Sequence, residues 1–136
     1  MNSIAIQHKL TWRNAGLGLV FAWFMIGGVC HFTLTNAFVS AVPSYVPFPR
    51  EIVLITGVCE LVGALALLSR RLRALAGIAL CLFCVCVTPV HIEMLQHAER
   101  YHALTPPLLW ARLFLQPIFI AIIWFSTQNR RALRTD

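Results

Sequence analysis

Thr56–Ala64, TGVCELVGA, sets one carboxylate among residues that otherwise belong inside a lipid bilayer. A charged side chain near the middle of a membrane span costs at least about 2.5 to 3.5 kcal/mol, so it needs a partner or a water-filled cavity. Gly57, Glu60 and Gly63 or Ala64 recur at helical spacing, which places the carboxylate on a face that another helix can approach closely. We therefore expect a neighbouring helix to bring a polar partner to Glu60.

The composition predicts an integral membrane protein. Of the 136 residues, 59% are hydrophobic and 12% are charged, whereas a soluble domain is usually about a quarter charged. The net charge of +6 comes from basic residues at the ends of apolar runs, where they would contact lipid headgroups. The expected partner of this charge is therefore the lipid bilayer, and no nucleic-acid partner is predicted.

Four apolar runs are each long enough to cross a hydrocarbon core of about 30 Å. They cover approximately residues 15–39, 51–68, 74–92 and 107–125, and nothing between them is long enough to fold as a soluble domain. We expect a single transmembrane domain over residues 1–136, with an all-α fold in which four membrane-spanning helices form a bundle.

The distribution of Lys and Arg predicts the orientation of the chain. The leader before the first run carries two of these residues, the connector between the second and third runs carries three, and the tail carries three. The other two connectors hold only Arg50 and Arg100. By the positive-inside rule both termini should face the cytoplasm. We expect a multi-pass protein of a bacterial cytoplasmic (inner) membrane.

Four polar residues of the apolar runs should lie at similar depths. With a helical rise of about 1.5 Å per residue, Glu60 and His31 lie about 13 and 12 Å from the outer ends of their runs, and Arg112 and Gln116 about 8 and 14 Å. We expect Glu60 to pair with Arg112, whose guanidinium binds a carboxylate in a two-pronged manner. His31 and Gln116 would complete the hydrogen bonds. Such a cluster either locks the helices together or forms a site for a ligand or a proton.

Several motifs together resemble the DoxX-like family of small four-helix membrane proteins over residues 16–126. These motifs are His31-Phe32, Pro43-x-Tyr45-x-Pro47-x-Pro49, the Thr56–Ala64 stretch and Trp110-x-Arg112-Leu113-x-x-Gln116. The resemblance implies a four-helix membrane fold, and some relatives are linked to thiosulfate:quinone oxidoreduction or to thiol-redox complexes. The family's recurring polar positions correspond to His31, Glu60, Arg112 and Gln116.

One position departs from this family pattern. Many relatives have Asn at the end of the third run, where this chain reads Pro89-Val90-His91. His91 is therefore a fifth candidate for the polar pocket, either as a titratable group or as a polar cap at the membrane surface.

The Cys81-x-x-Cys84-x-Cys86 motif allows two interpretations. Thiolates and imidazoles suit a soft ion such as Cu(I). A cysteine buried in apolar surroundings behaves as a small, inert hydrophobe instead, and we adopt this interpretation. No metal site is predicted, and the cysteines are expected to be free thiols.

Three functions are compatible with these features. The leading prediction is a small subunit or accessory protein of a quinone- or thiol-linked membrane redox system, whose polar pocket holds a quinone headgroup. At most this is an accessory subunit of an oxidoreductase, and no catalytic residue is assigned. The alternatives are a non-enzymatic scaffold or chaperone-like protein and a small proton-coupled carrier. A protein partner or a homo-oligomer is expected in each case.

Overall fold

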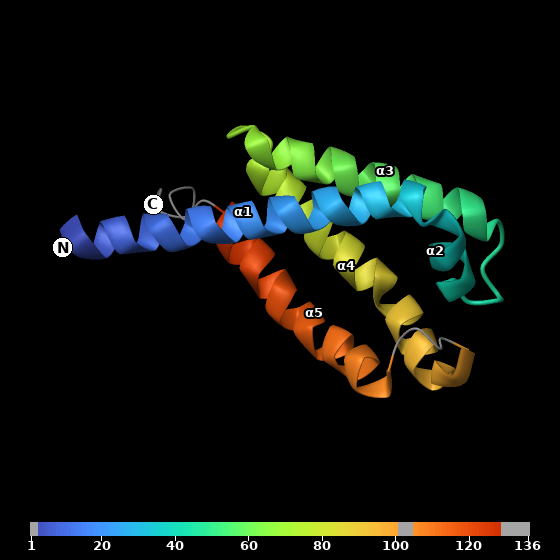
Figure 1. Ribbon diagram of the computed structural model, residues 1–136. Coiled ribbons are helices and arrows are strands. Elements are labelled where there is room, and N and C mark those ends of the chain that lie inside the picture. Colours follow the sequence, from blue (N-terminus) through green and yellow to red (C-terminus); the bar gives the residue numbers. More distant parts are fainter. Residues whose placement is uncertain (1–2, 101–104, 129–136) are drawn as a thin grey trace.

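The computed structural model describes the backbone of residues 3–100 and 105–128, and the side chains of residues 12–99 and 105–128. The regular secondary structure of these residues consists of helices joined by short connectors (Figure 1). In order, the helices are α1 (Ser3–Thr33), α2 (Thr35–Ala41), α3 (Pro49–Leu68), α4 (Arg73–Gln96), the short 3₁₀ helix η1 (Ala98–Arg100) and α5 (Pro106–Thr127).

Four of these helices are long and apolar enough to cross a membrane. They are the Trp12–Thr33 part of α1 and the whole of α3, α4 and α5. In the most apolar part of each span only 17% to 22% of the residues are buried inside the chain, so most apolar side chains point outward, as lipid-facing side chains do. The prediction of an all-α fold is confirmed for the described residues, and four of their helices are long and apolar enough to be the predicted spans.

The first apolar run is divided at Leu34. The backbone of Leu34 leaves the helical region with φ −118° and ψ 32°, so α1 ends at Thr33 and α2 begins at Thr35. The Thr35 hydroxyl donates a hydrogen bond to the carbonyl of His31 at 2.8 Å. Threonine side chains compete in this way with the helical backbone pattern. The run expected at 15–39 therefore contains one long helix and one short helix.

The buried core lies where the four long helices meet. Helices α1 and α4 each pack against both α3 and α5. The Phe24 ring lies 6.2 Å from the Phe83 ring and 5.9 Å from the Phe119 ring, measured between centroids, which joins α1 to α4 and α5. The cluster of buried side chains consists of Val20, Phe24, Ala64, Leu67, Ala76, Leu80, Cys84 and Ile123.

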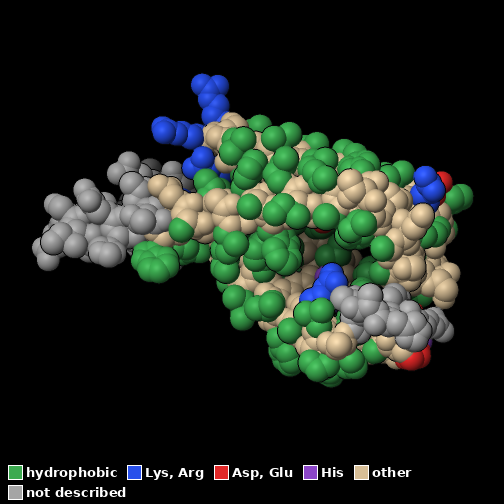
Figure 2. Space-filling view, in the orientation of Figure 1, with side chains coloured by type: hydrophobic (Ala, Val, Ile, Leu, Met, Phe, Trp, Pro, Cys, Tyr) green, Lys and Arg blue, Asp and Glu red, His purple; other side chains and the backbone are tan. Residues whose placement is uncertain are grey.

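Beyond this core the helices diverge. Figure 1 shows α5 touching α1 near the C-terminal end of α5 and separating from it toward the N-terminal end of α5. The two helices are joined at their contact by a hydrogen bond of 3.0 Å from Arg13 Nη2 to the carbonyl of Gln128. In the space-filling view a hollow with cationic and histidine atoms lies between α1 and the diverging helices (Figure 2). Polar side chains of the spans are therefore not all enclosed by the core.

The close approach of α1 and α3 depends on Gly57. A Cβ atom at this position would lie 2.6 Å from His31 Cβ and 3.0 Å from Phe32 Cε2. Both distances are shorter than a normal carbon–carbon contact of about 3.5 to 4.0 Å. The expectation that the glycine face of residues 56–64 receives another helix agrees with this contact, and α1 is the helix concerned.

We predict that Gly57→Ala destabilises the protein by about 1 to 3 kcal/mol, because α1 must move away from α3. Gly18→Ala is the matched control, since nothing lies within 4 Å of a Cβ atom at residue 18. Alanine favours a helix over glycine, so the control should not lose stability. The measurement is the free energy of unfolding in mixed detergent micelles. Equal effects of the two changes would contradict this account of the α1–α3 contact.

Candidate functional site

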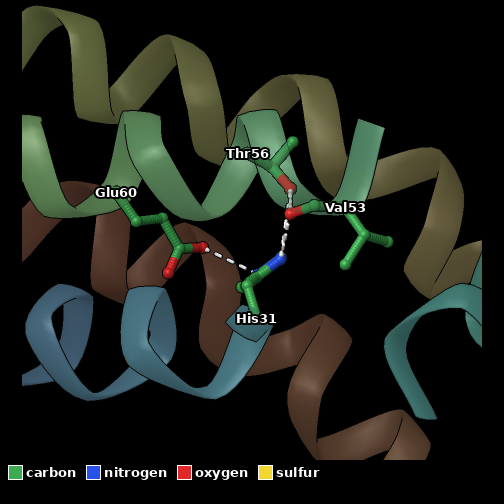
Figure 3. Close-up of polar contacts among 4 residues, drawn as sticks. All are labelled: His31, Val53, Thr56 and Glu60. Atoms are coloured by element: carbon green, nitrogen blue, oxygen red, sulfur yellow. Dashed lines mark hydrogen bonds and ion pairs between the residues drawn. The ribbon is translucent and has the colours of Figure 1, made fainter. Parts of the chain in front are cut away.

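His31 of α1 and Glu60 of α3 form a buried ion pair. The distance from His31 Nε2 to Glu60 Oε1 is 3.6 Å, and each residue is 9% exposed. Figure 3 shows the imidazole between the carboxylate on one side and the backbone of α3 on the other. The polar partner that the sequence required for Glu60 is therefore a histidine of the adjacent helix.

The hydrogen bonds on the other side of the ring determine where its proton lies. His31 Nδ1 is 2.8 Å from the carbonyl oxygen of Val53 and 3.2 Å from Thr56 Oγ1. The Thr56 hydroxyl donates its own hydrogen to the same carbonyl at 2.9 Å. Both neighbours of Nδ1 are thus acceptors, so Nδ1 carries a hydrogen and donates it.

This arrangement requires one further proton between His31 and Glu60. If Nδ1 carries a hydrogen, a neutral ring presents the lone pair of Nε2 toward the carboxylate. A lone pair and an ionised carboxylate repel each other, so a proton resides either on Nε2 or on Glu60. The pair has no net charge with this proton and carries a negative charge without it.

Residues of α1 and α2 pack closely against both members of the His31–Glu60 pair. A Cβ atom at Gly27 would lie 2.6 Å from Glu60 Oε2, so the carboxylate rests directly on the backbone of α1. The ring of Phe38 lies 4.2 Å from the ring of His31, measured between centroids, which brings α2 over the imidazole. These contacts restrict the orientation of both members of the pair.

Gln116 of α5 occupies a second polar position, against α4. Its amide nitrogen donates to the carbonyl of Cys84 and, at 3.0 Å, to Thr88 Oγ1. The Thr88 hydroxyl in turn donates to the same Cys84 carbonyl at 3.0 Å. The reversed amide would bring two acceptor oxygens together, so the nitrogen must face Cys84. This leaves Gln116 Oε1 buried without a hydrogen-bond partner among the described residues.

A cavity of about 290 Å³ adjoins Gln116. This volume is close to the lower limit of about 300 Å³ for small-molecule sites. The lining is mainly apolar, with Gln116 and Thr88 as its two side chains that form hydrogen bonds. The residues around it are Thr88, Leu113, Gln116, Pro117 and Ile120.

The expected pairing of Glu60 with Arg112 is not found. Two ion pairs form among the described side chains, His31 with Glu60 and His97 with Glu93, and neither includes Arg112. Arg112 is exposed on the diverging part of α5. The fifth predicted residue, His91, is half-buried on α4. Similar distances from the helix ends did not bring Glu60 and Arg112 together, because α5 is tilted away from the first pair of helices.

The five predicted pocket residues thus fall into two groups. His31 and Glu60 lie between α1 and α3, while Gln116, Arg112 and His91 belong to α4 and α5. The carbonyl of Cys84, a residue of the buried core, accepts a hydrogen bond from Gln116. Two participants, Thr56 and Thr88, were missed. Thr56 lies four residues before Glu60 and Thr88 lies three residues before His91, so helical spacing alone could have indicated both.

The cysteines are free thiols. Cys84 is buried, Cys81 is half-buried with its thiol 3.8 Å from the carbonyl of Ile120, and Cys86 is exposed. Within the described part of the chain, no three His, Cys, Asp or Glu side chains lie close enough together to hold a metal ion.

Comparison with known proteins identifies one family. The family described as "Domain of unknown function (DUF8561)" matches residues 20–127. No curated protein and no solved structure matches the chain. The matched residues include α3, α4, α5 and both polar groups.

We predict that His31 and Glu60 are energetically coupled. In a double-mutant cycle with His31→Ala and Glu60→Gln, the interaction should contribute about 0.5 to 3 kcal/mol to the free energy of unfolding. The cycle of Glu60→Gln with Arg112→Gln is the control, and its coupling should be below about 0.5 kcal/mol because the two residues do not touch. Additive effects in the first cycle, or strong coupling in the second, would be inconsistent with the described pair.

Proposed function

The chain belongs to the DUF8561 family, and because that description assigns no activity, we propose a function from the polar groups of the spans. The protein is a small integral membrane accessory subunit of a redox system, and it binds a quinol headgroup beside Gln116. The observation that carries this proposal is the buried Oε1 atom of Gln116, which has no hydrogen-bond partner among the described residues.

The chemistry of Gln116 favours a ligand that donates a hydrogen bond. Both hydrogens of its amide nitrogen are used, one by the Cys84 carbonyl and one by Thr88 Oγ1. What remains is an acceptor, and leaving it unpaired costs about 1 to 3 kcal/mol. A quinol has hydroxyl donors on an apolar ring, and this combination fits a mainly apolar cavity of about 290 Å³. The oxidised quinone offers only acceptors, so the reduced form should bind more tightly.

The resemblance to the DoxX-like family is the reason for choosing a quinol among hydroxyl-bearing ligands. A quinol supplies two electrons and two protons when it is oxidised. Within this chain, Gln116 and Thr88 would orient the headgroup, and His31 with Glu60 would hold a proton in the adjacent part of the membrane. A protein partner or a second copy of the chain would complete the redox system.

The proposal includes a membrane arrangement. The four spans form a bundle in a bacterial cytoplasmic membrane, with both termini in the cytoplasm. The excess of Lys and Arg in the leader, in the connector between α3 and α4 and in the tail supports this orientation. The cavity beside Gln116 then lies in the outer half of the bilayer.

We predict that quinol copurifies with the protein and is lost in Gln116→Leu. The change removes the acceptor, so retained quinol should fall about tenfold, as expected for a loss of about 1.4 kcal/mol. Gln96→Leu makes the same chemical change at an exposed position at the end of α4 and should retain quinol. The measurement is mass spectrometry of an organic extract from protein purified in mild detergent, kept anaerobic to preserve the reduced form.

One result of this experiment would contradict the quinol proposal. If neither wild type nor Gln96→Leu retains quinol while both remain folded, the redox proposal fails. The scaffold prediction would then take its place and would be examined by capture of membrane partners.

A proton-coupled carrier is the second candidate, and the buried His31–Glu60 pair favours it. We predict that proteoliposomes containing wild-type protein and a trapped pH-sensitive dye report proton flux along an imposed gradient. Glu60→Gln removes the proton-holding carboxylate and should abolish the flux, whereas Glu51→Gln at the exposed start of α3 should not. Equal flux in wild type and Glu60→Gln would exclude this candidate.

A further inference from the structure

A second cavity, of about 220 Å³, lies at the opposite end of the molecule from η1. It is formed by the first half of α1, the connection between α3 and α4, the first turn of α4 and the last turn of α5. Its lining contains three arginines and no acidic residue. The residues around it are Arg13, Asn14, Leu17, Arg70, Arg73, Ala74, Ser126 and Thr127.

The positive charge of this cavity is not neutralised by the described chain. The four acidic residues with described positions are Glu51, Glu60, Glu93 and Glu99. Glu60 is the one placed furthest along α3 toward this cavity, and it still lies about 12 Å before the end of that helix. Cationic side chains gather where α3 and α4 meet, as the space-filling view shows (Figure 2). Like charges repel when brought together, so their convergence in one cavity favours an anionic ligand.

Two of the arginines are held in place by backbone carbonyls. Arg13 Nη2 donates to the carbonyl of Gln128 at 3.0 Å, and Arg73 Nε donates to the carbonyl of Leu67 at 2.9 Å. Each guanidinium has five N–H donors, so both retain further donors for a ligand. Arg13 Nε and Ser126 Oγ are buried and have no hydrogen-bond partner among the described residues. Two of the three guanidinium groups that line the cavity are therefore fixed in position and keep N–H donors beyond those bonded to the chain.

We propose that this cavity binds a phosphate group, and that the phosphate belongs to an anionic membrane lipid. Guanidinium groups match the oxygen atoms of a phosphate in charge and in geometry. The cavity lies at the ends of the spans, at the level of the lipid headgroups, on the side that carries most of the Lys and Arg residues. Basic pockets between helices on the cytoplasmic side are typical sites for anionic lipid headgroups. This site is separate from Gln116 and from the His31–Glu60 pair.

The neighbouring residues Arg70 and Arg71 allow a comparison of two variants that have the same net charge. Both are exposed and adjacent, but Arg70 lines the cavity and Arg71 does not. The protein is placed in phosphatidylcholine nanodiscs that contain a small fraction of phosphatidylglycerol, and the bound phosphatidylglycerol is counted by native mass spectrometry. Arg70→Gln should lower its retention about tenfold or more, through loss of a charge-assisted hydrogen bond. Arg71→Gln should lower it about fivefold at most, as one surface charge does.

A second arm distinguishes a lipid from a soluble anion. Inorganic phosphate is added to the protein in phosphatidylcholine nanodiscs, and its effect on thermal unfolding is compared with that of phosphatidylglycerol. Stabilisation by phosphatidylglycerol that Arg70→Gln removes supports a lipid phosphate. Stabilisation by inorganic phosphate alone keeps the phosphate site and overturns its assignment to a lipid.

The proposal fails on either of two results. Wild-type protein that does not select phosphatidylglycerol over phosphatidylcholine, and is not stabilised by inorganic phosphate, has no such site. Equal losses in Arg70→Gln and Arg71→Gln would mean that general surface charge attracts the lipid. Thermal unfolding in pure phosphatidylcholine verifies that both variants are folded, and Arg70→Lys, which keeps the charge, should recover part of the retention.

Discussion

The cost of placing the Glu60 carboxylate inside a bilayer is the constraint on which the rest of this structure depends. An unpaired charge at that depth is expensive, and α1 relieves the cost by bringing His31 to within 3.6 Å. That approach is possible because Gly27 and Gly57 have no side chains to separate the two helices. The imidazole is oriented in turn by the Val53 carbonyl and Thr56 (Figure 3). The polar pair and the tight packing of α1 on α3 are therefore one feature, since neither forms without the other.

The polar residues of the second pair of long helices, α4 and α5, have other partners. α4 and α5 meet the first pair at the apolar core and then diverge, so their polar residues are not drawn into the His31–Glu60 contact (Figure 1). Gln116 instead satisfies its amide nitrogen on α4, and its buried Oε1 atom has no hydrogen-bond partner among the described residues. The basic cavity at the other end arises from the same convergence of the helices near the core. Along α5, Gln116 and the basic cavity thus lie on opposite sides of the apolar core.

Much of the fold was accessible from the sequence, and particular residues show why. The apolar runs predicted α3, α4 and α5 to within a few residues, because length and hydrophobicity are local properties. The glycine pattern around Glu60 predicted the face that another helix covers. The interruption at Leu34 was missed, because it depends on hydrogen bonds from threonine hydroxyls that compete with the helix backbone. Arg112 was assigned to Glu60 because depth along a helix can be calculated, whereas the tilt of the helix cannot.

By itself the sequence determined that this protein is helical and apolar enough to span a membrane four times, and that Glu60 requires a polar partner. These conclusions follow from the free energy of transferring each side chain into hydrocarbon, which depends mainly on the residue type. Only the tertiary structure decided that His31 is the partner and that Gln116 Oε1 has no hydrogen-bond partner among the residues described. It also decided that Arg13, Arg70 and Arg73 line one cavity. The physical reason is that contacts between spans depend on crossing angles and rotations, which arise from the packing of all the helices together.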